Sequence, residues 1–183
     1  MLKSFTHIKV KPGTEKTLIK KILTIPEVLE VHLIMGEFDL LMVLGIERTL
    51  TAKPWEQLNE ILIEKIRRMT GILETQTMIP TSSRIKKNHL FEFSKLARGF
   101  VYIDTKPGRE SSAMDQLFQL DEVHEAHLVP GKHDILAVVE VRKTVLPPRY
   151  PDLIERVVVN KISKVKDVEE TETIIPSAFN FKE

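Results

Sequence analysis

Apolar and polar residues alternate with two different periods in the first 80 residues. Segments rich in strand formers are separated by two stretches whose apolar residues recur at helical spacing. The first strand ends at Lys11-Pro12-Gly13, and Gly36-Glu37 is typical of a tight hairpin turn. The predicted strands are residues 5–10, 28–35, 38–46 and 73–79, and the predicted helices begin near Thr14 and at Pro54. This order is the β-α-β-β-α-β arrangement of a ferredoxin-like unit.

The pattern occurs twice. Residues 5–50 align without a gap on residues 100–145, with 16 identities in the 46 positions, and a one-residue insertion near 146–151 then shifts the offset from 95 to 96. The motifs shared by both copies are Lys-Pro-Gly-x-Glu, Glu-Val-x-Glu-x-His-Leu, Gly-x-x-Asp-x-Leu-x-Val and Glu-Thr-x-Thr-x-Ile-Pro. The chain is therefore predicted to be an α+β duplication of two ferredoxin-like βαββαβ units.

We expect a first domain at residues 1–80, a linker at 81–98 and a second domain at 99–183. A unit of this size has one sheet face left uncovered by its helices, and the other copy is the natural cover. The two sheets are predicted to pack face to face as an intramolecular pseudo-dimer that resembles a dimeric α/β-barrel. His89–Phe93 and Phe179–Phe181 alternate as short strands do, and both are interpreted as fifth strands that cross to the other copy and close a sheet edge.

Charge and composition narrow the function classes. The 27 Lys and Arg residues balance 26 Asp and Glu residues, which disfavours direct nucleic-acid binding. The absence of cysteine excludes disulfides, thiolate catalysis and zinc–thiolate sites. No apolar run is long enough to span a membrane, and a cytoplasmic location is expected.

Several motifs of the first copy resemble the effector-binding domain of the Lrp/AsnC family, which is also called the domain for regulation of amino-acid metabolism. They are Ile8-Lys9-Val10-Lys11-Pro12-Gly13-x-Glu15, Ile25-Pro26-Glu27-Val28-x-Glu30-Val31, Gly36-Glu37-Phe38-Asp39-Leu40-Leu41, Lys65-Ile66-Arg67-Arg68-Met69-x-Gly71-Ile72 and Glu74-Thr75-x-Thr77. The second copy resembles the family less closely, with Asp121, Lys132-His133 and Asp167 at the positions of Pro26, Glu37-Phe38 and Gly71.

The resemblance implies a regulatory module. Family members usually carry an N-terminal helix-turn-helix domain; here the first copy starts near residue 4, so a stand-alone tandem module without direct DNA recognition is expected. The implied partners are a small effector, commonly an amino acid, and other chains through self-association or mixed assembly with helix-turn-helix paralogues.

The resemblance also implies that effectors bind near the Gly-x-x-Asp hairpin, at Gly36 and Asp39 and at Gly131 and Asp134. Backbone amides at a glycine can approach a ligand carboxylate, and an aspartate can accept from an ammonium group. The alternative is that these four residues only stabilise the hairpin turns.

An enzyme is the competing hypothesis. Glu30 and His32 lie on one strand face, as do Glu125 and His127, and each pair would suit a metal site or an oriented general base. A solvated strand face explains the same pattern, and His124 points away from His127 unless the strand bulges. The sequence therefore predicts no enzyme, no catalytic residue, no metal site and no cofactor. A haem-related or monooxygenase-like barrel enzyme and a ligand-free assembly adaptor remain as alternatives.

Overall fold

The computed structural model of the chain describes residues 1–47, 53–89, 92, 95–146 and 148–181. These residues form two compact units. The first unit is Met1–Ile79 together with Pro176–Glu183, and the second unit is Pro80–Ile175.

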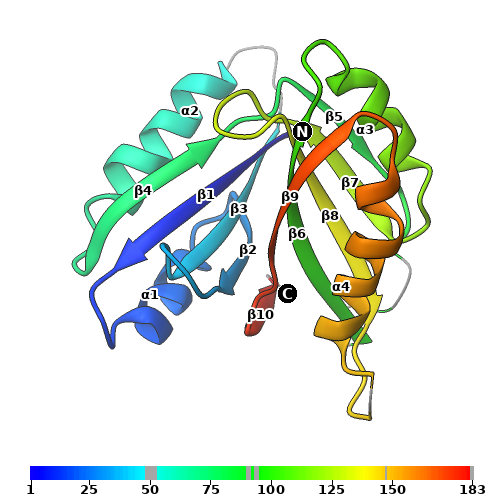
Figure 1. Cartoon of the computed structure of the whole chain (residues 1–183). Coiled ribbons are helices and arrows are strands. Elements are labelled where there is room, and N and C mark those ends of the chain that lie inside the picture. The colour runs from blue at the N-terminus through cyan, green and yellow to red at the C-terminus, as the bar shows by residue number, and fades with distance from the viewer. Residues whose placement is uncertain (48–52, 90–91, 93–94, 147, 182–183) are drawn as a thin grey trace. The chain divides into compact units, whose positions relative to one another are not determined.

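The first unit is an antiparallel five-stranded sheet with the strand order β10-β2-β3-β1-β4 (Figure 1). Its elements are β1 (Leu2–Val10), α1 (Glu15–Ile22), β2 (Val28–Leu33), β3 (Leu40–Ile46), α2 (Pro54–Glu60) with a π-helical continuation (Ile61–Ile66), β4 (Ile72–Met78) and β10 (Ala178–Phe181).

The second unit has the equivalent order β5-β7-β8-β6-β9. Its elements are β5 (Ser82–Ile85), β6 (Leu96–Thr105), α3 (Glu110–Phe118), β7 (Val123–Leu128), β8 (Ile135–Arg142), α4 (Tyr150–Asn160), a 3-10 turn (Ile162–Lys164) and β9 (Val168–Ile174).

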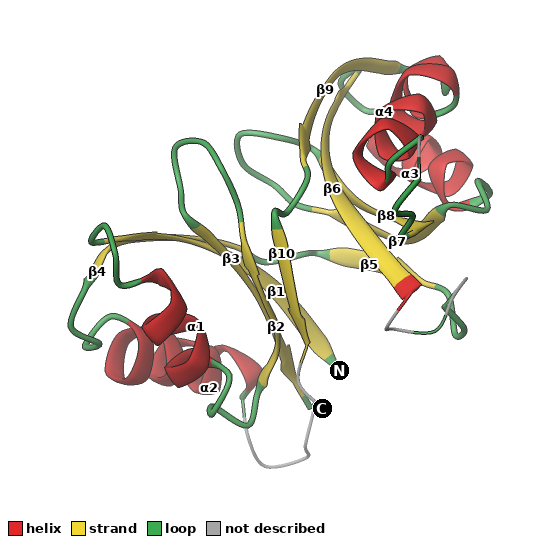
Figure 2. Cartoon of the chain, turned by 90° about the horizontal axis from the view of Figure 1, so that it is seen from below, coloured by secondary structure: helices red, strands yellow, loops and turns green. Residues whose placement is uncertain are grey.

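Both helices of each unit cover the same face of its sheet (Figure 2), which confirms the predicted α+β class and the two ferredoxin-like units. The central strand β3 is buried on both faces, as its continuous apolar run predicts, with Leu40 to Leu44 at most 2% exposed. Ile8, Leu40, Met42 and Leu44 belong to the core that also contains helix residues such as Leu18 and Leu58. The alternate residues of these strands therefore lie on the sheet face away from the helices.

Each sheet is completed by a strand from the other half of the sequence. β10 pairs with β2 from Ala178↔Leu33 to Phe181↔Glu30, as expected for the C-terminal segment. The strand from the linker is Ser82–Ile85, which pairs with β7, and not the expected 89–93 segment. Pairing begins directly after Pro80, with Thr81 N donating to Leu128 O, so the short edge of β7 is filled before the chain reaches residue 89. Leu90, Phe91 and Phe93 lie outside the described residues.

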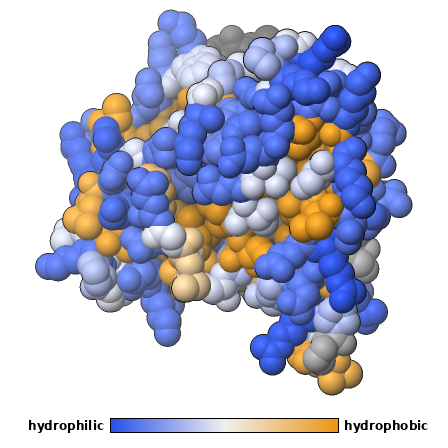
Figure 3. Space-filling view, viewed as in Figure 1, coloured by the Kyte–Doolittle hydropathy of each residue, from blue (hydrophilic) through white to orange (hydrophobic). Residues whose placement is uncertain are grey.

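Charged and polar side chains cover much of the surface visible in Figure 3, with apolar side chains grouped between them. The most exposed large apolar residues include Met35, beside the first hairpin turn, and Val145 on the loop between β8 and α4. Among the helices that the structure describes, none combines the length and the apolar character needed to cross a membrane.

The turn before β4 gives a prediction about backbone strain. Gly71 has φ of 102°, and a Cβ built there would lie 3.1 Å from Thr14 Oγ1; the corresponding residue of the second unit, Asp167, also has a positive φ of 72°. We expect Gly71→Ala to lower the free energy of unfolding by about 1–2 kcal/mol, because a Cβ is disfavoured in the left-handed region. Asp167→Gly should leave stability unchanged or slightly higher. Urea denaturation measures both, and an equal loss in the two variants would contradict the explanation.

Candidate functional site

The two hairpin aspartates hold the hairpins against the neighbouring strand. Asp39 Oδ2 accepts a hydrogen bond of 2.8 Å from Val10 N, at the point where β1 changes register between Lys9 and Val10. Asp134 Oδ2 accepts from Thr105 N at 2.8 Å and from Thr105 Oγ1 at 3.1 Å, at the equivalent irregularity of β6. A bulge leaves an amide without a ladder partner, and each aspartate supplies one. Both aspartates therefore have a structural function, whatever else they bind.

The hairpin turns themselves are open. Gly36 has φ of 131°, in the region that favours glycine, and both Gly36 and Gly131 are exposed. A Cβ built on either glycine would have no heavy atom within 4 Å outside its chain neighbours. The backbone of each turn is thus accessible to a small molecule, although the aspartate beside it is half-buried.

A pair of stacked or tilted rings lies beside each hairpin, and the two pairs differ. In the first unit His7 stacks on Phe38, with ring centroids 5.2 Å apart. In the second unit Tyr102 and His133 occupy the corresponding positions, with centroids 5.4 Å apart. Burial, with a smaller contribution from the charge of Glu172, raises the pKa of Tyr102 far above its ordinary value, so its hydroxyl stays protonated.

The second hairpin also carries more charge. His133 Nδ1 lies 2.9 Å from Asp104 Oδ1, and its Nε2 lies 3.5 Å from Glu172 Oε2. Lys132 Nζ donates to the same Glu172 oxygen at 3.3 Å. The first copy has Phe38 at the position of His133, so the two hairpin sites are chemically unequal.

The Glu–His pairs predicted from strand period are formed in both units. His32 Nε2 lies 2.8 Å from Glu30 Oε2, and His127 Nε2 lies 2.9 Å from Glu125 Oε2. The prediction that they lie on a solvated strand face is wrong, because all four residues are buried and both histidines are 0% exposed.

The fifth strand of each sheet contacts these histidines. Phe179 and Phe181 of β10 pack edge-on against His32, with ring centroids 5.7 and 5.6 Å away. In the second unit Ser83 Oγ of β5 lies 2.8 Å from His127 Nδ1. Each fifth strand therefore contacts the histidine of the strand with which it pairs.

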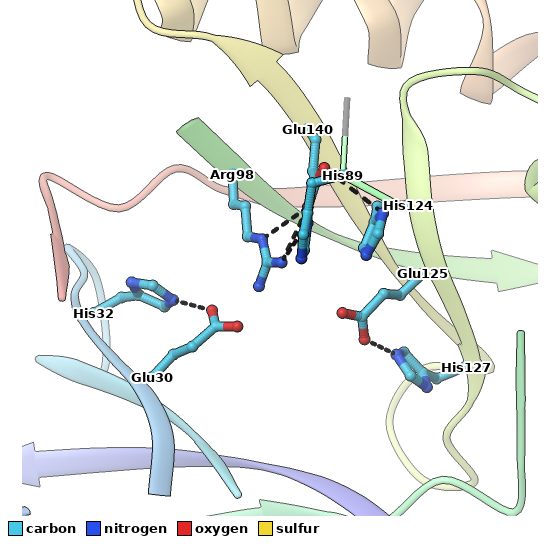
Figure 4. A network of polar contacts seen from close by, with 8 residues as sticks. All are labelled: Glu30, His32, His89, Arg98, His124, Glu125, His127 and Glu140. Carbon is cyan, nitrogen blue, oxygen red and sulfur yellow. Dashed lines mark hydrogen bonds and ion pairs between the residues drawn. The ribbon is translucent and has the colours of Figure 1, made fainter. Parts of the chain in front are cut away.

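The second unit has an additional buried cluster around Glu140, which we call the Glu140 cluster: Glu140, Arg98, His89 and His124 (Figure 4). Arg98 donates to Glu140 Oε1 from Nε at 3.1 Å and from a terminal nitrogen at 3.0 Å. His89 Nδ1 lies 2.7 Å from the same oxygen, and His124 Nδ1 lies 3.6 Å from Oε2. The two imidazole rings are stacked, with centroids 4.3 Å apart.

His124 reaches this cluster because β7 bulges there, between Val123 and Glu125. In a regular strand His124 and His127 would point to opposite faces. The bulge is the irregularity that changes the direction of His124. Burial lowers the pKa of His124, against the opposing attraction of Glu140 and Glu125, so the ring is neutral near pH 7.

The sequence analysis did not predict the Glu140 cluster, although the differences between the two copies indicate it. Arg98, His124 and Glu140 correspond to Lys3, Leu29 and Gly45 of the first copy. Two of the three positions change from an uncharged residue to an ionisable one, and such a change in a predicted strand is unusual. His89 has no counterpart in the aligned part of the first copy.

Both units are ferredoxin-like modules with open hairpin turns, and comparisons with known proteins show what they are similar to. Residues 3–90 of the 183 match the Lrp/AsnC ligand binding domain. An uncharacterised helix-turn-helix-type transcriptional regulator of Pyrococcus furiosus is 36% identical over 79 residues, which are 42% of this chain and 49% of that protein. The chain spans about half the length of the curated relatives that it matches.

Solved structures extend the comparison. The crystal structure of FFRP-DM1 is 34% identical, and the match covers 43% of this chain and 97% of that one with a TM-score of 0.38. A siroheme decarboxylase, NirDL, has a TM-score of 0.64 at 9% identity and covers 98% of this chain and 74% of its own. At that identity the second likeness concerns the fold alone, over both units of the chain.

Proposed function

We propose that the chain is a tandem regulatory module that binds an amino acid or a related small metabolite at its two hairpins. The ligand carboxylate would contact the exposed backbone at Gly36 or Gly131. The ligand ammonium group would contact Asp39 or Asp134. The match of residues 3–90 to the Lrp/AsnC ligand binding domain supports this assignment over an enzyme.

The observation that carries the proposal is that only one of the two carboxylate oxygens of each aspartate is used to stabilise the fold. Oδ2 of Asp39 and Oδ2 of Asp134 anchor the bulged strands. Neither Oδ1 accepts a hydrogen bond from any residue in the described part of the chain. A half-buried carboxylate oxygen beside an open glycine turn is suited to an ammonium group, because charge-assisted hydrogen bonds are the strongest of their kind.

Regulation would follow from assembly. An effector shifts an equilibrium only if it binds one state more tightly than another, so the proposed ligand must prefer one self-associated or mixed state. Mixed assembly would join the module to helix-turn-helix paralogues and modulate transcription indirectly. A ligand-free adaptor instead requires an oligomeric state that no metabolite changes. A haem-related or flavin enzyme requires cofactor binding at micromolar concentration.

The test is thermal unfolding of the chain with each of the twenty amino acids and common metabolites, with the mass followed by light scattering. A ligand at a hundred times its dissociation constant should add about 2.7 kcal/mol of stability, which raises Tm by a few degrees. Asp39→Asn and Asp134→Asn are the informative variants. Asparagine can still accept from the bulge amide through its carbonyl oxygen, but it has lost the charge that holds the ammonium group.

The shift should fall by at least half in one of these variants and vanish in the double variant. Asp115→Asn is the matched control, since Asp115 is an exposed carboxylate on α3 whose partner is Arg84. A selective shift that survives in the double variant would place the ligand elsewhere. If no compound changes Tm and the mass stays the same, the sensor proposal is rejected in favour of the ligand-free adaptor.

A further inference from the structure

We propose that His89, His124 and Glu140 of the second unit bind a divalent transition-metal ion such as zinc. The candidate ligand atoms of these three residues lie within 4.8 Å of one another. Two imidazoles and one carboxylate are the donor set of open zinc sites and of non-haem iron sites. The site is independent of the hairpins and of the function proposed for them.

The spacing of the two innermost donors is close to that of bound ligands. A tetrahedral zinc ion about 2.0–2.1 Å from each ligand holds neighbouring ligand atoms about 3.3 Å apart. His124 Nδ1 and Glu140 Oε2 are 3.6 Å apart. His89 contacts the other carboxylate oxygen from a segment that is not part of the sheet, its ring stacks on that of His124, and its side chain is 27% exposed. Binding of one ion by both histidines requires the more exposed His89 ring to turn out of this stack, because an imidazole nitrogen ligates in the plane of its ring.

Arg98 would not bind the metal itself but would orient the carboxylate that does. Its Nε and a terminal nitrogen both donate to Glu140 Oε1, and the other carboxylate oxygen, Oε2, lies 3.6 Å from His124 Nδ1. Carboxylate ligands of metals are themselves held by hydrogen bonds, and these partners orient the ligating oxygen.

The buried charges around the site favour an added cation. Arg98 contributes one positive charge, whereas Glu140 and the neighbouring Glu125 contribute two negative ones, and all three residues are at most 2% exposed. Buried charges are unfavourable unless they are compensated. A divalent ion held by His89, His124 and Glu140 would add positive charge beside these two carboxylates.

The first copy indicates that the fold does not need this cluster. The cross-strand pair Arg98↔Glu140 corresponds to Lys3↔Gly45, with the same register in both sheets. In the first unit Leu29 packs over Gly45, and a Cβ built on Gly45 would lie 2.8 Å from Leu29 Cδ1. An apolar contact therefore occupies the place where the second unit has His124 and Glu140. Replacement of a stable apolar contact by buried charged groups, which are costly to desolvate, is expected at functional sites.

The bulge at His124 supports the same inference from the backbone. Both copies bulge at this position, between Val28 and Glu30 and between Val123 and Glu125. Bulges re-aim side chains and are over-represented beside functional sites. In the second unit the re-aimed side chain is a histidine.

Zinc binding to the full chain, measured by calorimetry in competition with a chelator, tests the proposal. We expect one zinc ion per chain with at least micromolar affinity, and an affinity loss of more than about tenfold in His124→Leu and in Glu140→Gln. His124→Leu installs the residue of the first copy. His133→Phe, which also installs a first-copy residue (Phe38), is the matched control and should bind zinc as the parent does.

Equal affinity in the parent and in His124→Leu would overturn the proposal, as would the absence of micromolar binding to the parent. If His124→Leu or Glu140→Gln does not fold, two further measurements decide. His89→Ala changes a residue outside the sheet and should weaken zinc binding by more than about tenfold. X-ray absorption at the zinc edge of the parent should show two imidazoles and a carboxylate oxygen, and a shell with fewer than two imidazoles would reject the site.

Discussion

Replacing Arg98 by methionine is expected to lower the free energy of unfolding of the second unit by about 3–5 kcal/mol. Glu140 is 0% exposed and Arg98 is 2% exposed, so neither group can exchange its partner for water. The substitution removes both guanidinium hydrogen bonds to Glu140 Oε1 and leaves this buried carboxylate without its guanidinium partner. Breaking a buried pair from one side is far more costly than removing both partners. Urea denaturation in the presence of a chelator, with circular dichroism as the readout, measures the loss.

Three comparison variants give this prediction its meaning. Lys3→Met makes the corresponding change in the first unit, where the cross-strand partner is Gly45, and should alter stability by no more than about 0.5 kcal/mol. Arg98→Lys keeps the charge but not the fork of two donors, so an intermediate loss is expected. Arg98→Met combined with Glu140→Leu should be less harmful than Arg98→Met alone. A loss below about 1 kcal/mol in Arg98→Met would show that the guanidinium is not what stabilises Glu140 in the fold.

The fold was largely predictable because its signals are local and occur twice. Strand and helix periods, the Lys-Pro-Gly turn and the Gly-x-x-Asp hairpin all act within a few residues, and the repeat doubles the evidence for each. The same locality explains the Glu30–His32 contact, since residues two apart on a strand share a face. The burial of that pair was missed because Phe179 and Phe181, which cover His32, are about 150 residues away in the sequence.

The candidate sites were predictable only in part, for a related reason. Asp39 and Asp134 were identified by motif, but their bonds to Val10 and Thr105 depend on bulges that no periodicity reveals. The Glu140 cluster joins β6, β7, β8 and the segment after β5, so its members come together only through sheet register. Register follows from the pairing of whole strands, which a single sequence does not determine at this level of detail.

Ending the chain at Ser177 is expected to destabilise the first unit by about 3 kcal/mol, because this truncation removes β10. The strand pairs with β2 over four residues, and Asn180 Nδ2 donates to Val31 O at 3.1 Å. Each lost hydrogen bond is worth about 1 kcal/mol or less, and the half-buried rings of Phe179 and Phe181 add roughly 1 kcal/mol each. The sheet would be left with β2 as an exposed edge, and the buried pair of Glu30 and His32 would be open to water.

Hydrogen exchange measures this loss with an internal control in the same sample. Amides of β2 should exchange at least about a hundredfold faster in the truncated chain, because each 1.4 kcal/mol of local stability corresponds to a factor of ten in the opening equilibrium. Amides of β7, whose edge is covered by β5, should keep their protection. The double variant Phe179→Ala/Phe181→Ala separates the rings from the backbone and should produce the larger part of the effect. Unchanged protection of β2 after truncation would mean that β10 does not hold this edge, and that the burial of His32 has another origin.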